Sequence, residues 1–370
     1  MRKEKGRERR TDARTVAFFR YSYYEPAFRY FAEHVLDSRF LALPPSTRYA
    51  EEVGEAQASE EVCTPFKRIL GDFTEALEAG ADVLIQFTGF CRLTYYGELQ
   101  EIALRDRGFT DFTMLNFAQL EGASLTQYLA RFEEAAGHRL SIPRVLAGLM
   151  GCYRMVEHLD EFHAYWFAHA AFEREEGSFA RVRDDFLGAL SRAHTVREIE
   201  RASKQAMARV KALPLAEPAH SMRIGVIGDY YTAADAEGNM RLVQRLIDAG
   251  MSVSADMTIS RRNLHYDEPA LRATVSEYLS HDTGPTSSMN LAAARRYADA
   301  GFDGIVHAKA ACCTPEIDLM PTLQRFSREQ GIPMLFLTFD EQTSDAGLET
   351  RLEAFLDLCT LRKTAREQAQ

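Results

Sequence analysis

Apolar positions change their spacing twice along this chain, and the changes divide it into three parts. Over residues 15–117, short apolar runs such as 16–19 alternate with stretches whose apolar residues recur every three to four positions. Residues 119–211 keep only the helical spacing, and strands and helices alternate again from Met222 onward. Such alternation favours parallel, doubly wound sheets. We therefore predict an α/β fold: two Rossmann-like parallel-sheet domains that face one another, with a helical insertion between them.

The same patterns set the predicted domain boundaries. The first 14 residues carry seven basic and three acidic side chains and no apolar face, which is typical of a disordered basic tail. In the helical part we expect several separate helices, one beginning at Pro143 and another over residues 162–172. The predicted parts are the tail (1–14), an N-terminal α/β domain (15–118), a helical domain (119–213) and a C-terminal α/β domain (222–370).

Composition narrows the classes of function. The net charge of −10 over 370 residues does not favour nucleic-acid binding. No segment approaches the ~18–20 apolar residues of a membrane span, and no apolar stretch of a secretory signal follows the basic start. We therefore expect a cytoplasmic protein with no nucleic acid or membrane as partner. The working hypothesis for its assembly is a homodimer.

The tripeptide Cys-Thr-Pro occurs at residues 63–65 and again at 313–315. Each copy precedes an amphipathic stretch, a glycine and an apolar run, so each predicts a helix with threonine as N-cap and proline in its first turn. A helix N-terminus lowers the pKa of a nearby thiol and favours anions. Two such cysteines, Cys63 and Cys313, in matching positions of two similar units predict a shared metal or redox site.

Further cysteines lie where a site would form in a parallel sheet. Cys91, Cys312 and Cys313 follow predicted strands, and ligands gather beyond the carboxyl ends of such strands. Thiolates select zinc, copper(I) or iron–sulfur clusters, although a cysteine is often simply buried. Cys152 and Cys359 fall on helical patterns, and we expect them in the core.

Four segments resemble one known family. They are EVCTPFK at 61–67, GFCRLTYYGELQ at 89–100, GFDGI at 301–305 with CTPE at 313–316, and FDEQT at 339–343 with AGLETRLEAF at 346–355. The chain resembles the 2-hydroxyacyl-CoA dehydratase and benzoyl-CoA reductase family, especially its acyl-CoA dehydratase activase-related, double-cubane-cluster-like proteins. It departs from the family pattern at Asp72, where the family has histidine, and at Thr94, where the family has glycine.

This resemblance implies an iron–sulfur cluster, either 4Fe–4S or a linked double cubane, held by Cys63, Cys91 and Cys313. Cys312 is a fourth ligand, a neighbour or an apolar filler. The resemblance also implies an ATP-hydrolysing activator protein that supplies low-potential electrons. Lys67 and Arg92 lie beside two of the ligands and would raise the cluster's potential, unless they are ordinary surface charges.

Two more residues are candidates for catalysis. His307 comes shortly before the cysteine pair and could hydrogen-bond substrate or cluster, or be buried with its own partner. Glu341, beside Asp340, follows an apolar run and could act as a general acid or base, or belong to a turn before the last helix.

Three functions follow as hypotheses. The first is low-potential electron transfer with reductive or dehydratase-type chemistry on a small molecule, as in a 2-hydroxyacyl-CoA dehydratase-like lyase or an ATP-dependent reductase component. The others are a non-catalytic, cluster-holding electron carrier and a zinc-thiolate structural protein. No nucleotide loop of the form G-x-x-x-x-G-K-[ST] occurs, so ATP hydrolysis would fall to the partner. An acyl-CoA substrate rests on the resemblance alone.

Overall fold

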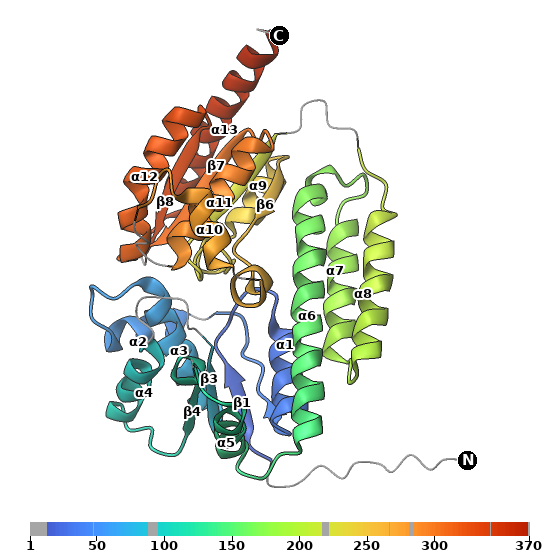
Figure 1. Cartoon of the computed structure of the whole chain (residues 1–370), viewed down its shortest axis with the longest axis vertical. Coiled ribbons are helices and arrows are strands. Elements are labelled where there is room, and N and C mark those ends of the chain that lie inside the picture. The colour runs from blue at the N-terminus through green and yellow to red at the C-terminus, as the bar shows by residue number, and fades with distance from the viewer. Residues whose placement is uncertain are drawn as a thin grey trace.

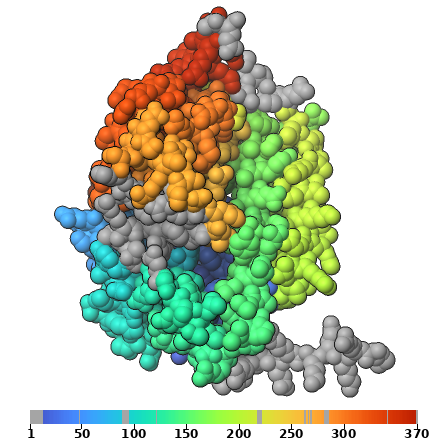
Figure 2. All heavy atoms as spheres, viewed as in Figure 1, coloured from blue at the N-terminus to red at the C-terminus, as the bar shows by residue number. Residues whose placement is uncertain are grey.

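The computed structural model describes most of the chain (Figure 1). The described residues are 13–46, 48–87, 95–120, 122–216, 222–265, 267–280, 285–340 and 342–368. Figure 2 shows one α/β unit stacked on the other, with a group of helices, in green, along one side. The first 12 residues, most of the predicted tail, lie outside the described part; Arg14 lies inside it and donates to Thr113 Oγ1 over 2.8 Å.

The first unit is a four-stranded parallel sheet in the order β2-β1-β3-β4. Its strands are β1 (Thr15–Phe18), β2 (Arg39–Phe40), β3 (Val83–Gln86) and β4 (Thr113–Asn116). Its helices are α1 (Glu25–Tyr30), the π-helical turn η1 (Phe31–Val35), α2 (Arg48–Gln57), α3 (Thr64–Glu78) and α4 (Tyr96–Asp106). All residues of β3 are buried, as expected for a strand covered by helices on both faces.

The second unit repeats this strand order as β6-β5-β7-β8, again parallel throughout. Its strands are β5 (Arg223–Gly228), β6 (Ser252–Ala255), β7 (Gly304–Ala310) and β8 (Met334–Phe339). Its helical segments are α9 (Leu242–Asp248), the π-helical turn η4 (Ser260–Leu264), α10 (Glu268–Val275), α11 (Pro285–Asp299), α12 (Thr314–Gln330) and α13 (Asp345–Gln368). The predicted α/β fold with Rossmann-like parallel sheets is confirmed.

The segment of the chain between β4 and β5 is mainly helical. Its helices are η2 (Phe117–Leu120), α5 (Leu125–Ala136), α6 (Ile142–His169), η3 (Ala170–Phe172), α7 (Ser178–Ser191) and α8 (Val196–Lys211). No helix in the described part of the chain is both long enough and apolar enough to cross a bilayer.

The prediction of separate helices from Pro143 and over residues 162–172 was wrong, because α6 runs unbroken for 28 residues. Two glycines inside α6 allow other elements to approach it closely and do not end the helix. A Cβ at Gly151 would lie 2.3 Å from the ring of Tyr30, and one at Gly148 would lie 2.8 Å from the carbonyl of His34.

Helix α6 runs beside both α/β units and binds them together (Figure 1). The buried carboxylate of Asp160, near the middle of α6, accepts hydrogen bonds from both sides. Tyr23 and Tyr24 of the first unit donate their hydroxyls, and Ser260 of the second donates its backbone N–H over 2.9 Å. Removing this carboxylate would leave buried donors from both units without a partner, so Asp160 fixes their relative position.

Candidate functional site

The carboxyl ends of the two sheets face one another, and several contacts join them. Tyr21, just after β1, donates its hydroxyl to the carbonyl of Tyr230, just after β5, over 2.6 Å. Thr64, at the start of α3, donates its hydroxyl to the carbonyl of Phe339, at the end of β8, over 3.4 Å. Ligands of open parallel sheets bind beyond the carboxyl ends of the strands. The interface between the units is therefore where a site is expected.

Cys63 reaches this interface from the first unit. It is the N-cap of α3, with extended backbone and no capping bond from its side chain, and it is half-buried. Its Sγ lies 2.7 Å from the hydroxyl of Tyr96, the first residue of α4. Thr64 and Pro65 follow as the first two helical residues, so the predicted threonine cap is displaced by one residue.

Cys313 reaches the same interface from the second unit as the N-cap of α12. Burial raises the pKa of its thiol, and the carboxylates of Asp229 and Glu316 and the charge of Cys63 raise it further. The expectation that the helix N-terminus would lower this pKa was wrong, because burial and two carboxylates outweigh the helix end. Cys63 and Cys313 thus cap helices that reach the interface from separate units.

The two Cys-Thr-Pro segments occupy different places in the two sheets, contrary to the predicted match. Helix α3 lies between the second and third strands of its unit, whereas α12 follows the third strand, β7. In the chain order, the first-unit counterpart of Cys313 is the segment after β3, which contains Cys91. Cys91 and Arg92 lie outside the described residues, as does Glu341.

A buried polar network lies beneath Cys313. Glu316, one turn into α12, accepts from Thr286 over 2.6 Å and from Asn290 over 2.9 Å, and it pairs with Nε2 of His307 over 2.7 Å. The side chains of His307 and Glu316 are both 0% exposed. His307, the predicted candidate, is thus buried with its own partner, Glu316, which was the alternative expectation. Its Nδ1 has no hydrogen-bond partner among the described residues.

Asp229 completes this network at the end of β5. Its carboxylate accepts from the backbone N–H of Ala310, the last residue of β7, over 2.7 Å, and from Thr232 over 2.8 Å. Burial raises the pKa of Asp229, and these hydrogen bonds oppose the rise. Sequence reasoning missed Asp229, Asn290 and Glu316 as a group because they lie on separate elements; the carboxyl group directly after a buried strand was the available signal.

The remaining predicted residues lie around or away from the interface. Lys67, half-buried in the first turn of α3, lines a cavity of about 250 Å³ with Thr64, Phe339 and Asp340. Asp340 accepts from the backbone N–H of Gln342, which favours the turn over a catalytic role.

The other cysteines in the described part are also free thiols. Cys312 is exposed, with a left-handed φ of 60°. Cys359 is buried in the core, as expected, and burial raises its pKa to about 12. Cys152 packs against the core from a half-buried position, and burial raises its pKa as well.

A large aromatic cavity, not foreseen from the sequence, lies between the first unit, the helices and the segment 234–244 of the second unit. It has a volume of about 690 Å³, and its lining includes Phe18, Phe28, His163, Trp166 and Phe167. A small cavity of about 40 Å³ shares Arg20, Tyr21, Asp235 and Glu237 with it and is also lined by Thr64 and Pro65, which follow Cys63. The two cavities are therefore neighbours, and the smaller one borders the segment that follows the first cysteine.

Comparison with known proteins finds one family similar to the second unit and the helices before it. Residues 185–358 match the family model of 2-hydroxyglutaryl-CoA dehydratase, D-component. The match spans α8 and all four strands of the second sheet and includes Cys313, Asp229 and the His307–Glu316 pair. No curated protein matches the chain. Over these residues the chain is similar to the 2-hydroxyacyl-CoA dehydratase family.

Proposed function

We propose that this protein holds an iron–sulfur cluster between its two α/β units and uses it in reductive or dehydratase-type chemistry on a small molecule. The proposed ligands are Cys63, Cys91 and Cys313, with Cys312 as the candidate for a fourth. The observation that carries the proposal is that Cys63 and Cys313 are the N-caps of α3 and α12, at facing sheet ends joined by the Thr64–Phe339 hydrogen bond. The family match over residues 185–358 supports dehydratase-type chemistry, with an acyl-CoA as the candidate substrate.

The residues at the interface fit such a group. Thiolates are the usual protein ligands of iron–sulfur clusters, and the N-termini of α3 and α12 would offset part of a cluster's negative charge. The hydroxyl of Tyr96, 2.7 Å from Cys63 Sγ, can donate a hydrogen bond to the sulfur, which tunes a bound metal group. The raised pKa of Cys313 keeps the free thiol protonated, so metal binding would release that proton.

The buried network would position the ligand from the second unit. Glu316 and Cys313 share the first turn of α12, and Glu316 is bound to His307, Thr286 and Asn290. Asp229 holds the end of β7, three residues before Cys313, through the N–H of Ala310. These contacts limit the motion of the Cys313 loop, which a cluster bridging two units requires.

The aromatic cavity is the proposed chamber for the substrate. Its volume of about 690 Å³ falls in the range of small-molecule sites, and its lining combines aromatic rings with charged side chains such as Arg183 and Asp235. The adjoining small cavity leads toward Thr64 and Pro65 and so toward Cys63. An apolar or aromatic body on the substrate would suit this lining.

A bound cluster would supply single electrons at low potential. We propose that an ATP-hydrolysing activator protein provides them, since the chain lacks the phosphate loop G-x-x-x-x-G-K-[ST]. Thiols that must stay reduced fit the cytoplasm, which we propose as the protein's compartment.

Anaerobic purification tests the proposal. We expect a brown protein with roughly four iron atoms per 4Fe–4S cluster and matching acid-labile sulfide. A colourless protein that binds zinc through the same cysteines would contradict the proposal. Turnover of 2-hydroxyacyl-CoA thioesters with a reduced activator protein then separates an enzyme from a carrier: a cluster that is reduced without turnover of any thioester would indicate a carrier.

A further inference from the structure

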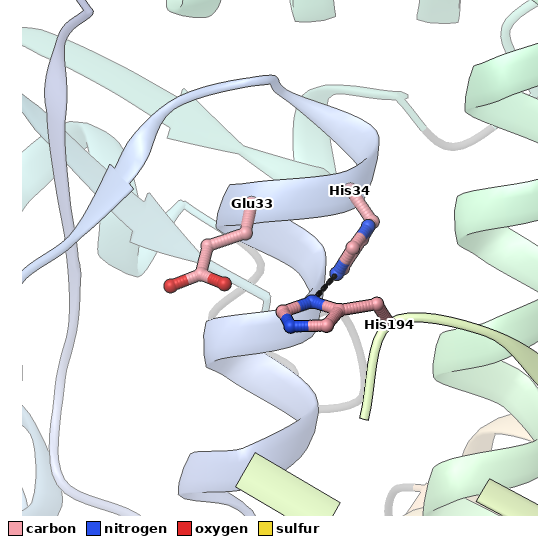
Figure 3. A group of neighbouring side chains, drawn as sticks. All are labelled: Glu33, His34 and His194. Atoms are coloured by element: carbon pink, nitrogen blue, oxygen red, sulfur yellow. Dashed lines mark hydrogen bonds between the residues drawn. The ribbon is translucent and has the colours of Figure 1, made fainter. Parts of the chain in front are cut away.

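A second group of metal-binding side chains lies far along the chain from the cysteines. Glu33 and His34 belong to η1, and His194 lies in the turn between α7 and α8 (Figure 3). One ligand atom from each residue lies within 4.8 Å of the other two. Figure 3 shows His34 and His194 with ring nitrogens directed at each other, and Glu33 on the same side of the helix.

The distance between the two rings fits a shared metal ion. Nε2 of His34 lies 3.3 Å from Nδ1 of His194. Two nitrogens bound to one tetrahedral zinc at about 2.0–2.1 Å are about 3.3–3.4 Å apart. In the metal-free protein this spacing permits one N–H···N hydrogen bond, so ion binding would replace that bond without moving the rings apart.

Neighbouring residues hold the backbone of all three candidates. Arg144 of α6 donates to the carbonyl of Glu33 over 2.9 Å and to that of His34 over 3.4 Å. On the other side, the N–H of His194 donates to Glu198 over 2.7 Å. The backbone that carries the ligands is therefore held before any ion arrives, which lowers the entropic cost of binding.

The local helix geometry also brings Glu33 and His34 together. Consecutive residues of an α-helix point about 100° apart, because it has 3.6 residues per turn. Residues 31–35 form a π-helical turn, which is wider and therefore brings Glu33 and His34 closer to one face. Such turns are rare and occur frequently at functional sites.

We propose that Glu33, His34 and His194 form a zinc site with a water molecule in the fourth position. Two imidazoles and one carboxylate are a ligand set that zinc accepts. The site joins the first α/β unit to the turn between α7 and α8, so the ion would act as a cross-link between η1 and the helical part. This inference does not depend on the cysteine centre or on the proposed function.

Calorimetric titration of untagged, metal-free protein with Zn²⁺ tests the site, with His34→Ala, His194→Ala and Glu33→Gln as variants. His169→Ala is the matched control, because His169 is half-buried like His34 but its Nδ1 bonds to the carbonyl of Tyr165. We expect each histidine variant to bind at least 10- to 100-fold more weakly, since loss of an outer hydrogen-bond partner alone costs that much. The control should bind like the wild type.

Co²⁺ separates this site from the cysteines. A site of nitrogen and oxygen ligands gives cobalt d–d absorption without a thiolate charge-transfer band, and that absorption should vanish in His194→Ala. Because His194 is exposed, its variant should fold, and circular dichroism checks this. Equal zinc affinity and equal cobalt spectra in the wild type and both histidine variants would overturn the proposal.

Discussion

The two α/β units share one strand order but differ in the contacts made just beyond their two central strands. In the first unit Phe19, just after β1, stacks on Phe87, just after β3, with ring centroids 4.7 Å apart. In the second, Asp229, just after β5, accepts a hydrogen bond from Ala310 at the end of β7 over 2.7 Å. One unit thus ends in an aromatic cluster beside a cavity, and the other ends in a buried polar network beside a cysteine.

Under the proposed function, the two units would have different tasks. Aromatic rings around a cavity offer an organic molecule apolar surface, as is typical of small-molecule sites. A polar network fixes a loop, because each buried donor or acceptor costs free energy when it loses its partner. Accordingly, we expect ligands and protons to act mainly on the aromatic cluster of the first unit. Loss of a single hydrogen-bonding group should act mainly on the polar network of the second.

The largest expected effect is a loss of stability in acid, caused by His163 in the aromatic part of the structure. His163 stacks on Tyr23 at 3.5 Å, and burial lowers its pKa from 6.5 to about 3. The stability that this shift contributes is present above pH 6.5 and is lost as the pH falls toward 3, by up to about 5 kcal/mol. The difference in unfolding free energy between wild type and His163→Phe, measured by urea unfolding from pH 7 to 3, should follow this loss. A difference that is constant with pH would contradict it.

Substitution of Glu316 should destabilise the buried polar network of the second unit. Glu316→Ala leaves His307, Asn290 and Thr286 without their buried partner and should cost about 3–5 kcal/mol in chemical unfolding. Glu329→Ala is the matched control on the same helix, where Glu329 pairs with Arg325 at the surface, and no measurable change is expected. Similar losses for both variants would show that the network does not stabilise the second unit.

The first unit also contains a buried carboxylate, Asp72, which should make its stability depend on pH. Asp72 accepts from the backbone N–H of Arg20 over 2.7 Å, yet burial raises its pKa from 3.8 to about 6. A raised pKa means that stability present below pH 3.8 is lost as the pH rises through 6, by about 3 kcal/mol. Asp72→Asn should lack this loss between pH 4 and 6, whereas the exposed Glu52→Gln should retain it. Identical profiles for the wild type and Asp72→Asn would contradict this.

Trp166 gives the smallest but most local signal. It is the only tryptophan in the chain, and it lines the aromatic cavity. Nitrobenzene, an aromatic quencher, should enter the cavity and reduce the Trp166 fluorescence in a saturable manner. Quenching that rises linearly with concentration, as for collisions in solution, would argue against ligand entry.

Much of the fold could be predicted from the sequence, because buried strands and amphipathic helices have distinct periods. The breaks in α6 were wrongly predicted because close packing at Gly148 and Gly151 cannot be seen in a single sequence. The lowered pKa at Cys313 was wrongly predicted for a similar reason. Local helix geometry was visible, whereas the burial of the thiol and the carboxylates of Asp229 and Glu316 depend on tertiary structure.

Iron content after anaerobic reconstitution, compared among single Cys→Ala variants, tests the central claim most directly. The claim is that Cys63 of the first unit and Cys313 of the second hold one cluster. We predict that Cys63→Ala and Cys313→Ala each lose most of the bound iron and sulfide, while Cys152→Ala and Cys359→Ala keep the wild-type amounts. Full iron in either of the first two variants would contradict a shared cluster between the units.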